Sequence, residues 1–415
     1  MCKKYSSALL ALALISLAGC GDNNTDHKTI RFKLVGDLSF SGEKASATKV
    51  FCAESGAFTV VNRDGTFELS CEIDVPDPEN IPVTGFSIEY PGLVPIRKSI
   101  RPVDGVSYAV SRWRTKPLST RTFAIPKAQA SHLEEINNDA LTFHWNSLVT
   151  EDNSLATGEA QVSMAAWDTS IPTSPYDVSL EALYPPFPVE VQTNDNSTPY
   201  LRTLAAVYLD VDQLLVNPDR GVDFEMINEH AGRPFGEKLE STDNRVFRQD
   251  ERTGVFVEQK EGILVQSNKL KGEISESGLW IWAKEVSPFG CIDFTVKIGD
   301  RLVEGAQFAV YDTNEIDSDQ SMLYETYGSP GGTARLKVPV GKQVNIQIWI
   351  VWDNQIKTAR TSDLAPENCT DKPSAVTIIF PCITTADCTG DSFCRGGVCI
   401  TPEHAAMFDI HEGDE

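Results

Sequence analysis

The sequence predicts an all-β protein with multiple β-sandwich domains plus a small disulfide-rich C-terminal module. Apolar residues recur at every second position in short runs, of which Ile30, Phe32 and Leu34 are the first, and this is the period of a half-buried strand. Turn sequences such as Asn62-Arg63-Asp64-Gly65 separate the runs. Only the stretch 128–138 has the composition of a short helix. The length exceeds what one core normally serves, so we expect several domains.

The first 19 residues have the organisation of a secretory signal. A pair of lysines precedes an apolar region of about ten residues, half of the roughly 20 needed to cross a bilayer. Leu17-Ala18-Gly19-Cys20 closes the region. This pattern resembles the lipobox of bacterial lipoproteins, which implies cleavage before Cys20 and its acylation with lipid chains such as palmitate. The alternative is an ordinary cleaved signal that happens to contain a cysteine.

The chain is strongly acidic, with a formal net charge of −23. Loss of the signal removes Lys3 and Lys4 and no acid, which lowers the charge by two more units to −25. Nucleic acids and anionic lipids both require clustered basic side chains, so we expect no nucleic-acid partner and membrane attachment only through the lipid on Cys20. Residues 20–28 are expected to form a polar tether. Gly21, where an aspartate would imply inner-membrane retention, favours the outer membrane in the cell envelope.

The cysteines indicate an oxidising compartment. Of the ten in the chain, one is lost with the signal and one is used for lipid, which leaves an even number in an exported protein and predicts disulfides. The eight remaining residues are Cys52, Cys71, Cys291, Cys369, Cys382, Cys388, Cys394 and Cys399.

Region 29–111 is strand and turn throughout. Cys52 and Cys71 flank its central hairpin at a spacing suited to tying neighbouring strands, and a loop of this size contributes about 3 kcal/mol of stability in the chain-entropy model. The motif Asp64-Gly65-Thr66-Phe67-Glu68-Leu69, followed by a strand ending in Tyr90-Pro91-Gly92, resembles the carboxypeptidase regulatory-like (transthyretin-like) domain. The resemblance implies a β-sandwich.

Region 112–290 is expected to be a larger β-rich domain. Its closing part, with strands leading to the pair Trp280 and Trp282, resembles the region shared by cartilage intermediate layer proteins and many bacterial lipoproteins, over about 123–344. That family has a His-Phe-Ser type sequence before its tryptophans, whereas Glu276-Ser277-Gly278-Leu279 stands here. The departure leaves the domain boundary open.

Region 291–380 is similar to the first sandwich. Gly305-Ala306-Gln307-Phe308-Ala309-Val310 matches the Gly-Ala-x-Val-x-Val strand of the regulatory-like family, which implies a second transthyretin-like sandwich. A disulfide between Cys291, near its first strand, and Cys369, near its last, would tie its two ends together.

Residues 381–400 form a cysteine-rich module, followed by an acidic tail over 401–415. So few residues cannot build a core without staples, so two disulfides are expected. Four cysteines allow three connectivities, of which we favour Cys382–Cys394 with Cys388–Cys399. The spacing is similar to the N-terminal cysteine-rich motif of Dickkopf proteins. A zinc site is the alternative, although paired C-x-x-C spacing is absent.

The sequence contains none of the common catalytic motifs for nucleophilic, zinc-dependent or phosphate-binding enzymes. Asp210 and Asp212 lie at strand spacing, but such pairs are expected by chance in an acidic chain. Trp280 and Trp282 are also two apart, which fits either a core position or a sugar-stacking platform, and we favour the core. A non-catalytic protein is therefore expected, with a hydrolase in 112–290 as the alternative.

Outside the cysteine-rich module, calcium is the one ion for which the sequence offers candidate ligands, and no other cofactor is implied. The acidic stretch after the Gly-Ala strand places Asp312, Asn314, Asp317 and Asp319 close together, and oxygen-rich loops suit Ca²⁺. The stretch does not follow the EF-hand register, so a solvated acidic turn is the competing interpretation.

These observations predict a lipid-anchored cell-envelope protein with a binding or structural role. Its expected partners are the membrane, through the N-terminal lipid, and an envelope protein or polysaccharide. An accessory subunit of an envelope complex is a further alternative.

Overall fold

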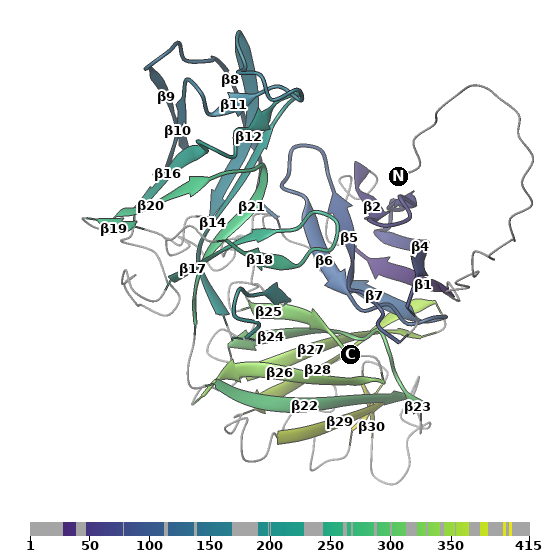
Figure 1. Ribbon diagram of the computed structural model, residues 1–415. Coiled ribbons are helices and arrows are strands. Elements are labelled where there is room, and N and C mark those ends of the chain that lie inside the picture. Colours follow the sequence, from purple (N-terminus) through teal and green to yellow (C-terminus); the bar gives the residue numbers. More distant parts are fainter. Residues whose placement is uncertain are drawn as a thin grey trace, which may run out of the picture.

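The computed structural model describes most of the chain from Lys28 onward (Figure 1). Every regular element in the described residues is a strand, which confirms the all-β class. None of those residues belongs to a helix long and apolar enough to span a membrane. The signal, Cys20, its tether up to residue 27 and the acidic tail lie outside the described residues. The described residues are 28–38, 47–77, 79–111, 115–136, 139–167, 190–197, 199, 201–227, 244–259, 264–266, 269–285, 289–298, 301–312, 322–328, 331–340, 344–352, 354–364, 374–380, 393–395 and 398–400.

The first unit is a sandwich of two sheets, with strand orders β4-β1-β7 and β3-β2-β5-β6. Its strands are β1 (Lys28–Asp37), β2 (Lys49–Cys52), β3 (Phe58–Val60), β4 (Thr66–Val75), β5 (Thr84–Glu89), β6 (Ile96–Ile100) and β7 (Ser107–Ser111). β1 pairs antiparallel with β4 and parallel with β7. β4 alternates exposed and buried residues along its whole length, so its apolar side chains face the core.

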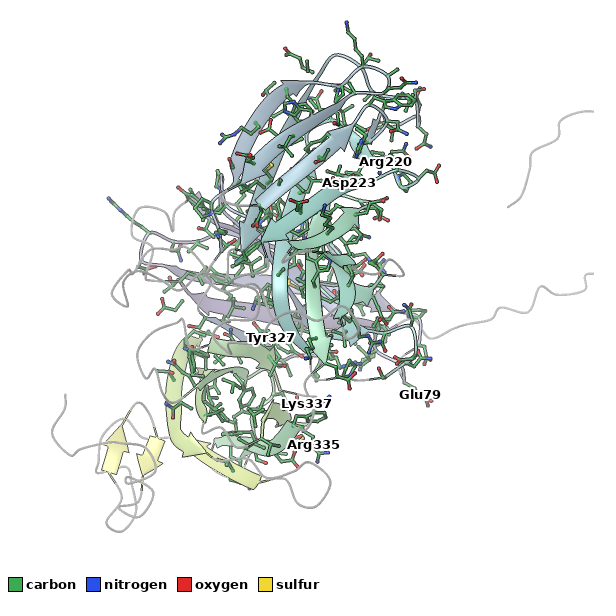
Figure 2. The ribbon with its side chains drawn as sticks, turned by 90° about the vertical axis from the view of Figure 1, so that its left-hand side faces the viewer. Glu79, Arg220, Asp223, Tyr327, Arg335 and Lys337 are labelled. Atoms are coloured by element: carbon green, nitrogen blue, oxygen red, sulfur yellow. A yellow bond between two sulfur atoms is a disulfide. The ribbon has the colours of Figure 1, made fainter. Side chains whose placement is uncertain are left out.

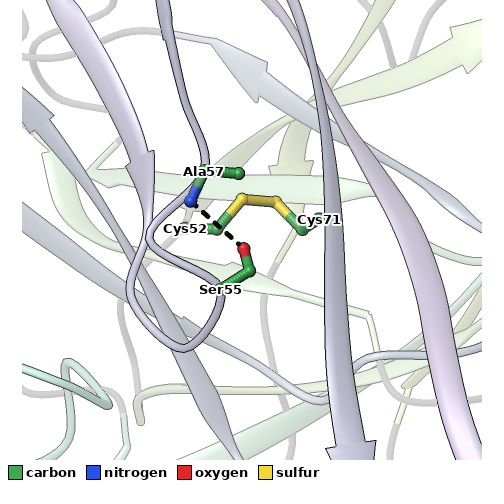
Figure 3. The surroundings of a disulfide bond; sticks show 4 residues. All are labelled: Cys52, Ser55, Ala57 and Cys71. Carbon is green, nitrogen blue, oxygen red and sulfur yellow. Dashed lines mark hydrogen bonds between the residues drawn. A yellow bond between two sulfur atoms is a disulfide. The ribbon is translucent and has the colours of Figure 1, made fainter.

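Cys52 and Cys71 form a disulfide within this core, with their Cα atoms 6.0 Å apart (Figure 3). Both residues are buried, at 3% exposure. The spacing predicted a bond between neighbouring strands. β2 and β4 instead belong to different sheets, so the bond links the two layers of the sandwich.

The third unit repeats the topology of the first. β22 pairs antiparallel with β26 and parallel with β29, as β1 does with β4 and β7. The opposing sheet has the order β25-β24-β27-β28, which corresponds strand for strand to β3-β2-β5-β6, and β23 is an added hairpin strand. Its strands are β22 (Phe289–Ile298), β23 (Arg301–Leu302), β24 (Gln307–Asp312), β25 (Met322–Tyr327), β26 (Thr333–Pro339), β27 (Val344–Trp352), β28 (Gln355–Leu364) and β29 (Ser374–Phe380). Cys291 in β22 is disulfide-bonded, and Cys369 lies outside the described residues.

The middle unit packs a seven-stranded sheet against a five-stranded one. The larger sheet comprises β13 (Val191–Gln192), β18 (Phe256–Glu258), β17 (Asn244–Gln249), β21 (Gly278–Glu285), β14 (Leu201–Val211), β12 (Glu159–Trp167) and β8 (Ser119–Ala124), in spatial order. The smaller comprises β19 (Leu264–Gln266), β20 (Lys269–Ile274), β16 (Val222–Ile227), β10 (Asp139–His144) and β9 (Ser131–Ile136). A short ladder joins β11 (Leu148–Val149) to β15 (Leu215–Val216).

The helix expected at 128–138 is wrong. Residues Ser131–Ile136 form β9, which pairs with β10 along its whole length. Exposure alternates along β9 with a period of two, and its last residue, Ile136, is buried in the core. The apolar residues of this stretch are too few to cover a helical face, so cross-strand pairing decides its structure.

The described part of the C-terminal module is a hairpin of β30 (Phe393–Arg395) and β31 (Val398–Ile400). Cys394 and Cys399 are directly opposite one another in its ladder. Cys382 and Cys388 lie outside the described residues, so the favoured connectivity stays a prediction. The hairpin contacts the third unit through β29 and β31.

Candidate functional site

Hydrogen bonds and close packing join the first unit to each of the other two, and these contacts determine which surfaces stay accessible to a partner. The third unit seals one edge of the first: Ala109 N–H in β7 donates to Gly305 O at 3.0 Å. The side-chain amide of Gln307 continues this pairing, since Ser111 N–H donates to its Oε1 at 2.7 Å and its Nε2 donates to Ser111 O at 2.9 Å. Tyr327 of β25, labelled in Figure 2, packs edge-on against Tyr108 of the first unit, with ring centroids 6.1 Å apart.

The middle unit seals a second edge of the first. The turn between β17 and β18 lies so close to β6 that a Cβ on Gly254 would approach the carbonyl carbon of Lys98 to 2.8 Å. Gln249 Nε2 donates to Arg97 O at 3.1 Å, and the Arg97 guanidinium pairs with Glu251 at 3.1 Å. These main-chain and side-chain contacts fix the middle unit against β6.

The tryptophan pair lies in the core. Trp280 and Trp282 in β21 are 0% and 1% exposed, and Trp282 stacks on Phe224 with ring centroids 4.7 Å apart. Gly272 leaves space for this indole, because a Cβ there would lie 3.2 Å from the Trp282 ring. The pair therefore offers no sugar-stacking platform, and the favoured core interpretation is confirmed.

Among the residues that the structure describes, a charged cluster on the outer face of the five-stranded sheet brings a histidine, an aspartate and an arginine together (Figure 2). His144 Nε2 lies 2.7 Å from Asp223 Oδ2, and Arg220 contacts the same carboxylate at 3.3 Å. Burial opposes ionisation of Asp223, but the hydrogen bonds from His144 and Arg220 outweigh it and hold the pKa of this carboxyl below its usual value. Asp223 is therefore an anion that orients its two partners.

In the described residues, no hydroxyl is hydrogen-bonded to His144 Nε2, as the nucleophile of a Ser-His-Asp triad would be. The Oγ of Ser147 accepts the backbone N–H of His144 at 2.8 Å, so it contacts the main chain and not the imidazole. Ser147 is fully buried, so it is not open to a substrate. The arrangement is that of a cross-strand polar ladder on a sheet face.

The acidic pair Asp210 and Asp212 lies at the end of β14, close enough for the charge of Asp212 to act on Asp210. Burial, with the nearby charges of Glu251 and Asp212, raises the pKa of Asp210. Like charges crowd at this end of β14 beside Arg97, where the first and middle units meet. These acidic side chains therefore belong to the contact between the first and middle units.

The other candidate sites lie largely beyond what the structure describes. Of the calcium candidates, Asp312 ends β24, while Asn314, Asp317 and Asp319 are outside the described residues. Within the described ranges, no group of three or more His, Cys, Asp or Glu side chains could hold a metal ion. Lipidation of Cys20 likewise stays a prediction.

One exposed apolar surface, which lies on β3, is not indicated by the sequence. β3, at the edge of its sheet, exposes Phe58 and Val60 at 58% and 46%. Alternating apolar residues normally indicate the buried face of a strand, so the sequence pattern alone gives no signal that these two side chains point outward.

Comparison with known proteins gives no family. No family model matches the chain, and no curated protein matches it. It is similar to two crystal structures of BcpA, the major pilin subunit of Bacillus cereus, one of them a variant. The identities are 10% and 9%, covering 85% of this chain and 98% and 99% of those chains. The TM-score is 0.14 in both, so the chains do not superpose and the likeness carries no argument about function.

Proposed function

We propose that this chain is a lipid-anchored cell-envelope protein whose role is non-catalytic: it binds a partner or builds part of the envelope. The observation that carries the proposal is the way its units are joined. The first sandwich is held to the second by a main-chain hydrogen bond and the amide of Gln307, and to the larger β-unit by Gln249 and an ion pair. The polar clusters of the described residues orient one another rather than a substrate. Such an assembly is a rigid support for surface contacts.

The compartment is supported by the disulfide chemistry. Cys52–Cys71 is a buried bond between layers, and such structural disulfides persist in oxidising environments rather than in the cytosol. The lipobox-like sequence would then provide the anchor at Cys20, on the outer membrane. The shared topology of the two sandwiches supports the transthyretin-like assignment of both.

Among partners, a protein is favoured over a polysaccharide. The two tryptophans that the sequence offered as a sugar-stacking platform, Trp280 and Trp282, are buried, and the exposed ring of Phe58 lies beside the aliphatic side chain of Val60. The apolar side chains exposed on β3 suit a protein contact. An accessory subunit of an envelope complex is one form that this role could take.

The test is membrane fractionation combined with protease treatment of intact cells. Wild type is expected in the outer-membrane fraction and cleaved by added protease, while Cys20→Ala is released in soluble form. Cys2→Ala is the matched control, because Cys2 lies in the signal and its loss leaves the lipidation position unchanged. Identical fractionation of Cys20→Ala and wild type would overturn the anchoring proposal.

A further inference from the structure

Among the described residues, no hydrogen bond reaches the outward main-chain groups of β3, and the strand also exposes apolar side chains. Cys52 N–H donates to Ala57 O, and Val61 N–H donates to Thr48 O. Main-chain groups alternate in direction along an antiparallel strand, so Ala57, Thr59 and Val61 point toward β2. Phe58 and Val60, between them, direct their N–H and C=O groups away from the sheet.

The same two residues also carry the apolar surface. Phe58 and Val60 share one face of β3, and the Phe58 ring lies 5.6 Å from that of Phe51 in β2. Phe51, Phe58 and Val60 thus form a small apolar shelf beside the unpaired edge. Phe58 and Val60 each offer one N–H donor and one C=O acceptor, and their side chains offer an apolar surface. A segment that adds as a strand to a sheet is recognised through these two kinds of contact.

The other three edges of this sandwich differ from β3. β7 is paired with Gly305 and Gln307, and β6 is covered by the turn at Gly254. β4 exposes a polar and acidic row, of which Glu68 and Glu72 form ion pairs with β1. Proteins normally blunt their open strand edges with charge or cover. Within the described residues of this unit, β3 alone combines an open edge with exposed apolar side chains.

We propose that β3 binds an extended segment of a partner protein, with apolar residues at alternate positions, which adds as a strand to the sheet β3-β2-β5-β6. This rests on the proposed binding role and gives it a site. The edge is only three residues long. Pairing through it alone would bury far less than the roughly 1,600 Å² that a stable pair of proteins typically buries. A second copy would also bring a like net charge, −25 for the chain without its signal, so a peptide segment is favoured over self-pairing.

Val60→Pro provides a selective test. Proline lacks the N–H that the segment would use, and it is tolerated at a strand edge where the N–H faces solvent. The matched control is Val60→Thr, which keeps the N–H and a β-branched side chain. Both are made in the chain from Gly21 onward and compared for binding of a fluorescein-labelled peptide of alternating valine and threonine with lysines at its ends.

The expected result is peptide binding to the wild type, affinity within about threefold for Val60→Thr, and at least tenfold weaker affinity for Val60→Pro. Equal binding by Val60→Pro, or no binding by the wild type, would overturn the proposal. Sedimentation tests self-association through the same edge. If the wild type forms dimers and Val60→Pro does not, the occupant of the edge is a second copy of the chain, and the proposal of a partner segment is overturned.

Single-residue hydrogen exchange keeps the test independent of how Val60→Pro folds. In the wild type, the amides of Phe58 and Val60 should exchange fast and that of Thr59 slowly, and the peptide should slow the first two. Slow exchange at Phe58 and Val60 without peptide would contradict the open edge. Failure here leaves the fractionation of Cys20→Ala unaffected, so the two proposals fail separately.

Discussion

Replacement of Gln307 by leucine should uncouple the first and third units. Gln307 is 2% exposed, and its amide makes two hydrogen bonds to the backbone of Ser111, at 2.7 and 2.9 Å. Leucine has a similar volume but no polar atoms. Gln307→Leu therefore leaves the Ser111 N–H and C=O without these partners in a buried interface.

The magnitude follows from the burial of Ser111, which is 8% exposed. A buried donor or acceptor left unpaired costs about 1–3 kcal/mol. Two such groups give a loss of roughly 2–6 kcal/mol in the free energy of unfolding, and water that reaches the gap would reduce this loss. The loss should appear as a less stable contact between units, with the third unit unfolding at lower denaturant concentration than the wild type.

The assay is urea denaturation followed by tryptophan fluorescence. Gln347→Leu is the control, because Gln347 lies in the same sheet and its side chain makes one exposed hydrogen bond, to Thr358. Its effect should stay within about 0.5 kcal/mol, as for most surface substitutions. If Gln307→Leu and Gln347→Leu shift the transition equally, the Gln307–Ser111 pairing does not couple the units.

Three other substitutions test the packing and electrostatics. Gly36→Ala should destabilise by about 1–3 kcal/mol by overpacking, because its Cβ would lie within the Phe67 ring, and Phe67→Leu in the same chain should restore part of this in a denaturant titration. Trp282→Ala should cost about 3–5 kcal/mol of unfolding free energy, and thermal melting with no loss would contradict its core position. The hydrogen bond from Arg245 lowers the pKa of Glu258 below 4.5, so this pair stabilises the fold above that pH, and the gain disappears as pH falls through the lowered pKa. Glu258→Gln should therefore flatten the acid limb of a stability–pH curve, and an unchanged limb would count against the pair.

The periodicity of apolar residues and the number and spacing of the cysteines gave the predictions that the structure confirms. Alternating apolar residues and turn sequences predicted the all-β class, and the spacing of Cys52 and Cys71 predicted their bond. The helix at 128–138 failed because a short stretch with few apolar residues satisfies neither period strongly. Pairing with β10, which no local pattern encodes, decides its structure.

The contacts between units could not be predicted. Gln307 and Ser111 are separated by 196 residues, and nothing local marks a buried glutamine as a substitute for a strand. The same holds for β3, because nothing in the local sequence marks Phe58 and Val60 as exposed. Their exposure follows from where the sheet ends, which is a property of the assembled sandwich.

The most direct test of the central claim is mass spectrometry of the N-terminal peptide of the protein purified from cell membranes. Surface attachment through Cys20 predicts a mature chain that begins at Cys20 and carries the added mass of its acyl chains. An unmodified Cys20, or a mature chain that begins at any other residue, would contradict the lipoprotein account.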